Sequence, residues 1–156
     1  MKNNNIVLEV ICCLLILLFG YTGISKILDY STFSFDLFRS IPVLDRIGFP
    51  AWIALSIPVF ELVIAAVLVV PRWRKLGLYA SLFTMIFFTL YVAFILGFMD
   101  KKPCSCGGVL REMSWTQHLW FNVFFTIISY WGIAIIKGRR WWPIKKDARI
   151  GNRVSP

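Results

Sequence analysis

Four long apolar segments dominate the sequence and restrict what the chain can fold into. They cover residues 6–26, 51–70, 76–98 and 118–136. Each is close to the length of about 20 residues that a helix needs to cross a hydrocarbon core. Strands of a membrane barrel alternate in polarity over about ten residues, and these segments are too continuous for that pattern. The sequence therefore predicts an all-α integral membrane protein, a bundle of four transmembrane helices.

The composition excludes an ordinary soluble domain. Of the 156 residues, 58% are hydrophobic and only 16% are charged, whereas a soluble domain carries about 25% charged residues. A chain this short has too little interior to bury so much apolar side chain in water, and lipid is the natural solvent for the excess. We expect one membrane domain over residues 1–136, followed by a basic cytoplasmic tail over residues 137–156.

The basic residues lie mostly outside the apolar segments and predict the orientation of the chain. Of the 17 Lys and Arg residues, 11 fall on the side that holds both termini and the turn after residue 70, and six on the other. The positive-inside rule then places both termini in the cytoplasm. The net charge of +9 indicates contact with membrane lipid. No nucleic-acid motif is present, so we expect no nucleic-acid partner.

The linker between the first two apolar segments has an amphipathic pattern. Its apolar residues Tyr30, Phe33, Leu37 and Ile41 follow three- and four-residue spacing. This predicts an extra interfacial helix that begins near Ser31 and ends before Pro42, on the outer face of the membrane.

Two cysteines stand one residue apart in the polar loop between the third and fourth segments, in the run Pro103-Cys104-Ser105-Cys106-Gly107-Gly108. The predicted orientation places this loop on the oxidising, periplasmic side. A C-x-C disulfide closes a very small ring, and strained disulfides are the more labile ones. Gly107 and Gly108 let the backbone turn, and the flanking basic residues favour thiolate. A redox-active pair fits these features. A static disulfide, free thiols and a metal site remain alternatives, although two thiolates alone make an incomplete metal site.

The fourth apolar segment begins with a capping box and carries a polar seam. Ser114 is followed three residues later by Gln117, which predicts the start of a helix. Polar residues then recur every four positions: Ser114, His118, Asn122, Thr126 and Tyr130. His118 is a candidate proton donor or acceptor for thiol exchange above it. The alternative is that the seam binds neighbouring helices by hydrogen bonds, which we favour for Thr126 and Tyr130.

Glu61 is the only acidic residue deep within an apolar segment. A carboxylate at the bilayer centre costs about 3 kcal/mol or more unless it is paired or protonated. Pro58, three residues earlier, leaves the carbonyl of Ala54 without its helical partner. An acid beside a kink is typical of a proton site or a quinone head-group site. The alternative is a protonated side chain hydrogen-bonded to a neighbouring helix.

Lys26 is the obvious cationic partner for Glu61. Counting residues by depth places Lys26 near the outer interface, well above Glu61, so the pairing requires a shifted helix or a kink. In the same first segment, Gly20 and Gly23 predict a close approach of another helix. Cys12 and Cys13 lie too deep in this segment to meet the outer loop, and buried apolar thiols are usually inert.

These features together resemble the MauE family of methylamine-utilisation membrane proteins, especially its Bacteroidetes members. The resemblance is carried by the run from Gly20 to Lys26, by Glu61 after Pro58, and by the stretch from Pro103 to Asn122 that includes Ser114-Trp115-Thr116-Gln117-His118-Leu119. It extends to about Ile136. MauE is itself similar to the wider DoxX-like four-span group.

This resemblance implies a bacterial inner-membrane protein with thiol–disulfide traffic at its outer face. The MauE family is associated with maturation of methylamine dehydrogenase beside a thioredoxin-like partner, and DoxX-like relatives with quinone-linked sulfur oxidation. The sequence contains no C-x-x-C motif, so any thioredoxin function has to come from a periplasmic partner.

Three functions follow from these patterns. The leading hypothesis is a thiol–disulfide relay or accessory, in which Cys104 and Cys106 exchange with a thioredoxin-like protein or an exported protein or peptide, with a quinone near Glu61 as electron carrier. The alternative is a non-catalytic scaffold for maturation or export, with the cysteines as a staple. A weaker alternative is a small transporter that uses Glu61.

Overall fold

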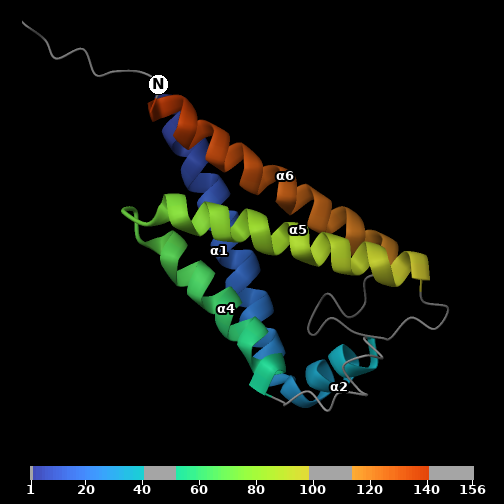
Figure 1. Ribbon diagram of the computed structural model, residues 1–156. Helices are drawn as coiled ribbons and strands as arrows, with labels where there is room; N and C mark the ends of the chain where they lie inside the picture. The colour runs from blue at the N-terminus through green and yellow to red at the C-terminus, as the bar shows by residue number, and fades with distance from the viewer. Residues whose placement is uncertain (1, 41–51, 99–113, 141–156) are drawn as a thin grey trace, which may run out of the picture.

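The computed structural model describes residues 2–40, 52–98 and 114–140, and the structural statements below concern these residues. They form five helices and, within these ranges, no strand (Figure 1). The helices are α1 (Lys2–Leu28), α2 (Tyr30–Ser40), α4 (Trp52–Val69), α5 (Arg74–Phe98) and α6 (Trp115–Arg140).

Four of these helices are long and apolar enough to cross a membrane, which confirms the predicted fold class. The apolar stretches are Asn5–Leu28, Trp52–Val69, Arg74–Gly97 and Trp115–Gly138. Each contains or closely matches the predicted segment, because mean hydropathy and length decide which stretch suits a bilayer. The chain is therefore a multi-pass membrane protein. The predicted tail begins within the last turns of α6, and residues 141–156 lie outside the described ranges.

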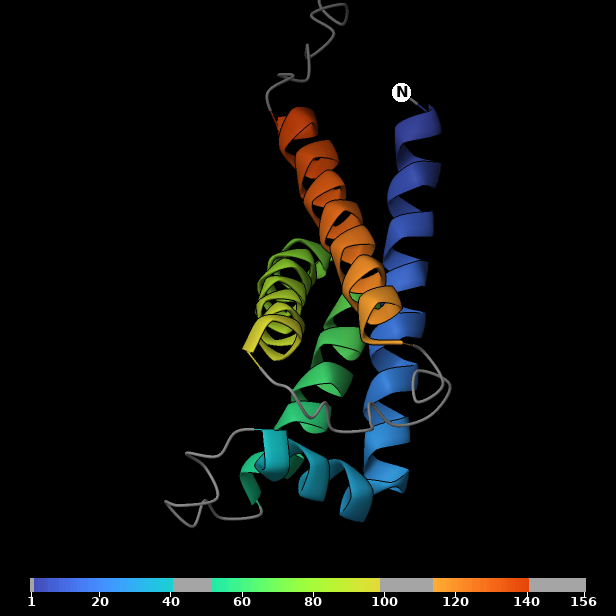
Figure 2. The ribbon, with the colours of Figure 1, turned by 90° about the vertical axis from the view of Figure 1, so that its right-hand side faces the viewer.

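The four spans pack as two antiparallel pairs. α1 packs mainly against α4, and α5 packs mainly against α6, with further contacts between α4 and α5 and between α1 and α6. Figures 1 and 2 show α4 and α5 diverging from their shared turn. The start of α1, the end of α6 and the α4–α5 turn lie toward the same end of the bundle, which we call the terminal end. The end of α5 and the start of α6 lie at the opposite end with α2, which we call the α2 end.

The short helix α2 confirms the predicted amphipathic helix, and its start at Tyr30 is one residue before the predicted start. Phe33 and Leu37 are partly buried, whereas Ser31 and Phe35 are exposed. The helix contacts α1 and α4. Ile41, the last residue of the predicted stripe, lies outside the described ranges.

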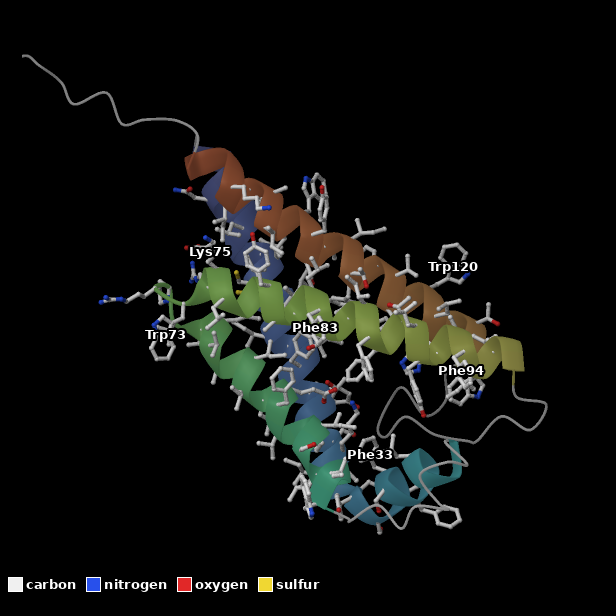
Figure 3. All side chains as sticks on the ribbon, in the orientation of Figure 1. Phe33, Trp73, Lys75, Phe83, Phe94 and Trp120 are labelled. Carbon is white, nitrogen blue, oxygen red and sulfur yellow. The ribbon has the colours of Figure 1, made fainter. Side chains whose placement is uncertain are left out.

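The core is small and mostly apolar, and many large apolar side chains face outward. Figure 3 shows two of the outward residues, Phe83 and Trp120, which are 71% and 68% exposed. This distribution suits a bundle that is surrounded by lipid. In lipid, burial of apolar surface contributes little to the association of helices. The buried cluster includes Leu15 and Phe19 of α1, Ile64 and Leu68 of α4, Leu78 and Met85 of α5, and Phe125 and Ile128 of α6.

One of the two predicted glycine contacts is confirmed. A Cβ atom on Gly23 would lie 2.9 Å from Cγ of Leu62 and 3.1 Å from the carbonyl oxygen of Pro58, so α1 and α4 approach closely here. The prediction for Gly20 is wrong, because a Cβ atom there would meet nothing within 4 Å. The three-residue offset turns Gly20 about 60° around the helix from Gly23, away from α4.

Candidate functional site

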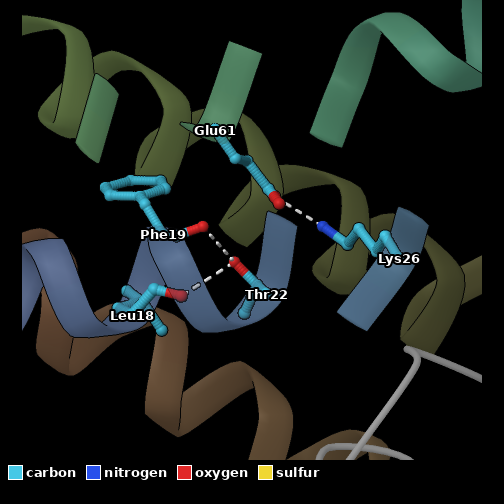
Figure 4. Close-up of polar contacts among 5 residues, drawn as sticks. All are labelled: Leu18, Phe19, Thr22, Lys26 and Glu61. Carbon is cyan, nitrogen blue, oxygen red and sulfur yellow. Dashed lines mark hydrogen bonds and ion pairs between the residues drawn. The ribbon is translucent and has the colours of Figure 1, made fainter. Parts of the chain in front are cut away.

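Lys26 and Glu61 form an ion pair inside the bundle. Nζ of Lys26 lies 2.5 Å from Oε1 of Glu61 (Figure 4). The Glu61 side chain is 1% exposed and the Lys26 side chain 12%. An unpaired charge at this burial is very costly, and the opposite charge offsets much of that cost. The pairing predicted from the sequence is therefore present.

The two side chains meet because they lean toward each other. Side chains of a helix tilt toward its N-terminus. Since α1 and α4 are antiparallel, the Lys26 side chain tilts toward the terminal end and the Glu61 side chain toward the α2 end. Gly23 lies one turn from Lys26, and Pro58 lies one turn from Glu61, so the close approach of the two helices falls beside the pair. Cα positions alone place the two residues at different depths, and the tilt of the side chains closes that gap.

Two phenylalanine rings complete the surroundings of the Lys26 ammonium. Nζ lies 4.9 Å from the ring centroid of Phe88 on α5 and 5.5 Å from that of Phe33 on α2. Both distances are within the range of about 6 Å for attraction between a cation and an aromatic face. Lys26 thus joins α1 to α4, α5 and α2. Neither ring was predictable from the sequence, because nothing in the local pattern distinguishes Phe33 and Phe88 from the many other phenylalanines.

Within the described residues, three buried side-chain atoms inside the spans have no hydrogen-bond partner. They are Oε2 of Glu61, Nδ2 of Asn122 and Oγ1 of Thr84. The hydroxyl of Thr22 does not serve Glu61, because it lies 2.9 Å from the Leu18 carbonyl oxygen, to which it donates (Figure 4). Buried polar groups normally have partners. These atoms therefore mark positions suited to water, a proton or a polar ligand.

The start of α6 has the predicted capping box. The Ser114 amide donates to Oε1 of Gln117 at 2.9 Å, and the Gln117 amide donates to Oγ of Ser114 at 3.3 Å. His118 is partly buried, and its ring lies nearly parallel to that of Trp115 with centroids 6.5 Å apart. Its role in proton transfer stays a prediction.

The rest of the seam on α6 is only partly internal. Asn122 is 3% exposed, and Oγ1 of Thr126 lies 3.3 Å from Oγ1 of Thr89 on α5. The predicted interhelical role is confirmed for Thr126. It is wrong for Tyr130, which is 65% exposed. Each four-residue step turns the helix by about 40°, so the seam leaves the interior before it reaches Tyr130.

The cysteine loop lies outside the described residues. Cys104, Cys106, Gly107 and Gly108 therefore stay as predicted site residues without a structural description. In the first span, Cys12 is buried and Cys13 is exposed, and both are free thiols. No group of three or more His, Cys, Asp or Glu side chains suited to a metal occurs in the described ranges.

These features define a four-span helical membrane protein with a buried ion pair between its first two spans. A family model described as methylamine utilisation protein MauE matches residues 4–135, most of the chain, so the protein belongs to the MauE family. No curated protein and no solved structure is similar enough to count as a match. The wider DoxX-like relationship stays a prediction.

Proposed function

We propose that the chain is an inner-membrane thiol–disulfide relay or accessory that uses Cys104 and Cys106 at the outer face. Its partner is a thioredoxin-like periplasmic protein or an exported protein or peptide under maturation. The observation that carries the proposal is the buried Lys26–Glu61 pair, whose Oε2 has no hydrogen-bond partner among the described residues. Such an intramembrane charge pair is expensive and usually functional.

The proposed exchange conserves atoms and electrons. A thiolate of the partner attacks the Cys104–Cys106 disulfide and forms a mixed disulfide. The second partner thiolate then displaces the bound cysteine. The partner gains a disulfide, and the C-x-C pair gains two electrons and two protons as two thiols. In this proposal His118, one turn into the helix that follows the loop, supplies or takes a proton during these steps.

The buried polar atoms suit a membrane quinone as the group that restores the disulfide. Oε2 of Glu61 can accept a hydrogen bond and Nδ2 of Asn122 can donate one, and neither has a partner among the described residues. Oε2 therefore suits the hydroxyl group of the reduced form, the quinol, and Nδ2 suits a carbonyl oxygen of the oxidised form, the quinone. When bound, a quinone takes the two electrons and two protons that the dithiol releases. Glu61 holds or delivers a proton at Oε2, and Lys26 fixes the other carboxylate oxygen.

Single cysteine replacements test the proposal against a scaffold. C104S and C106S each leave one thiol without its neighbour, so a relay accumulates a mixed disulfide with its partner on a non-reducing gel of cells alkylated at harvest. That band should vanish on reduction and be missing from C104S/C106S. The matched control is C12S/C13S, which should leave the wild-type pattern unchanged. Loss of the partner phenotype in C104S/C106S supports a relay, whereas a retained phenotype with no trapped band identifies a scaffold and overturns the proposal.

A further inference from the structure

The terminal end of the bundle carries a concentration of positive charge. The amide of Trp73 donates to the carbonyl oxygen of Val70 at 2.9 Å, and this tight turn joins α4 to α5. Four basic residues belong to this connection, to the start of α5 and to the end of α6: Arg72, Arg74, Lys75 and Lys137. At this end, Glu9 is the only acidic side chain in the part of the chain that the structure describes. The end is therefore suited to an anionic partner.

Arg74 has unused hydrogen-bonding capacity. Its Nη1 lies 3.8 Å from Oε1 of Glu9 on α1, which is an ion pair but too long for a direct hydrogen bond. Its Nε is buried and has no hydrogen-bond partner among the described residues. The side chain is 26% exposed, whereas Glu9 is 65% exposed. A guanidinium offers five donors in a planar fork that fits phosphate oxygens, so the exposed carboxylate leaves most of that capacity free.

The surroundings of Arg74 match the depth of a lipid head group. Trp73 is 55% exposed, and Figure 3 shows it beside Lys75 at the α4–α5 turn. Tryptophan is enriched at the membrane–water interface. Exposed apolar side chains follow on α5, including Leu76 at 64%. Nζ of Lys137 lies 5.9 Å from the ring centroid of Tyr79, so α6 adds a second cation against the second turn of α5.

We propose that Arg74, with Lys75 and Lys137, binds the phosphate of an anionic phospholipid at the terminal end. The partly buried guanidinium holds the phosphate, the two lysines add positive charge around it, and the acyl chains lie along the exposed apolar face of α5. The apolar surface directly below the charges favours a lipid over a free anion. Basic pockets between membrane helices are a recurrent way of binding acidic head groups. The proposal does not depend on the thiol chemistry.

Native mass spectrometry of the full chain in mixed phosphatidylglycerol and phosphatidylcholine micelles tests this site. The wild type should retain phosphatidylglycerol in preference to phosphatidylcholine. R74Q should lower the retention about fivefold, the loss expected for one basic contact to lipid. R72Q removes the same charge from an exposed position of the turn and should have a smaller effect. E9Q removes the competing carboxylate and should raise the retention.

Each of the following results would contradict the proposed lipid site. Equal losses in R72Q and R74Q assign the effect to diffuse surface charge. A lower retention in E9Q shows that the Glu9–Arg74 pair is only a structural clamp, and this variant remains informative if R74Q does not fold. Displacement of the lipid by an equimolar amount of inorganic phosphate shows a free-anion site instead.

Discussion

Gly23 of α1 lies directly against Pro58 of α4, where an added Cβ atom would be 3.1 Å from the proline carbonyl oxygen. One turn further along α1, Lys26 meets Glu61, which follows Pro58 by three residues. The close approach and the buried ion pair therefore belong to one helix crossing. Any change that separates α1 from α4 should also weaken the ion pair.

We predict that G23A destabilises the bundle, whereas G20A does not. The new methyl group at Gly23 overlaps Leu62 and the Pro58 backbone, and overpacking of this kind costs about 1–3 kcal/mol. At Gly20 the methyl group meets open space, and the gain in helix propensity is at most about 1 kcal/mol. Unfolding in SDS titrations, followed by circular dichroism, measures both. Equal effects of the two variants would show that α1 and α4 do not approach at Gly23.

We predict strong coupling between Lys26 and Glu61. K26M or E61Q alone leaves one partner without its opposite charge, and breaking a buried pair costs about 3–5 kcal/mol. K26M/E61Q removes both charges and should lose less stability than the sum of the single variants. The same SDS titration completes this double-mutant cycle. Additive losses would be incompatible with a direct ion pair.

We predict that S114A frays the start of α6. The substitution removes the side-chain acceptor of the Gln117 amide, and loss of such a cap costs about 1 kcal/mol. T116A is the matched control, because Thr116 is exposed in the same turn. Hydrogen exchange of the first-turn amides should rise in S114A only. An equal rise in T116A would mean that helix propensity, and not the cap, sets the stability of this turn.

We predict that the two ends of the bundle face opposite sides of the membrane, with the α2 end outside. In a background without native cysteines, S114C should react with a membrane-impermeant maleimide in intact cells. K75C at the terminal end should react only after the cells are opened. Both positions are exposed in the structure, so burial does not bias the comparison. The reverse labelling pattern would contradict the predicted orientation.

The spans were predictable because length and hydropathy alone decide which segments suit a bilayer, and the capping box was predictable because its two residues are local. The Lys26–Glu61 contact was only partly predictable, because it depends on the tilt of side chains in antiparallel helices. The positions of Phe33 and Phe88 beside Lys26 were not predictable, since they depend on how α2 and α5 pack.

Nearby helical positions do not all share one face, and this is why the predictions for Gly20 and Tyr130 are wrong. Gly20 and Gly23 are only three residues apart, yet only Gly23 contacts α4. Tyr130 follows Asn122 by eight residues, and the accumulated turn of about 80° carries it out of the interior. A turn of about 100° per residue, applied from Ser114 to Tyr130, gives the observed order of burial, in which Asn122 is the most buried.

The redox state of Cys104 and Cys106 in growing cells tests the central claim most directly. A membrane-impermeant maleimide is applied, with and without prior reduction, to cells that carry C12A/C13A. Comparison of the two treatments gives the fraction of Cys104 and Cys106 present as thiols and the fraction present as disulfide. The relay predicts that reduced and oxidised forms coexist, and that E61Q raises the reduced fraction because reoxidation is impaired. A pair that never reacts, or that is wholly disulfide-bonded in both backgrounds, would contradict the account.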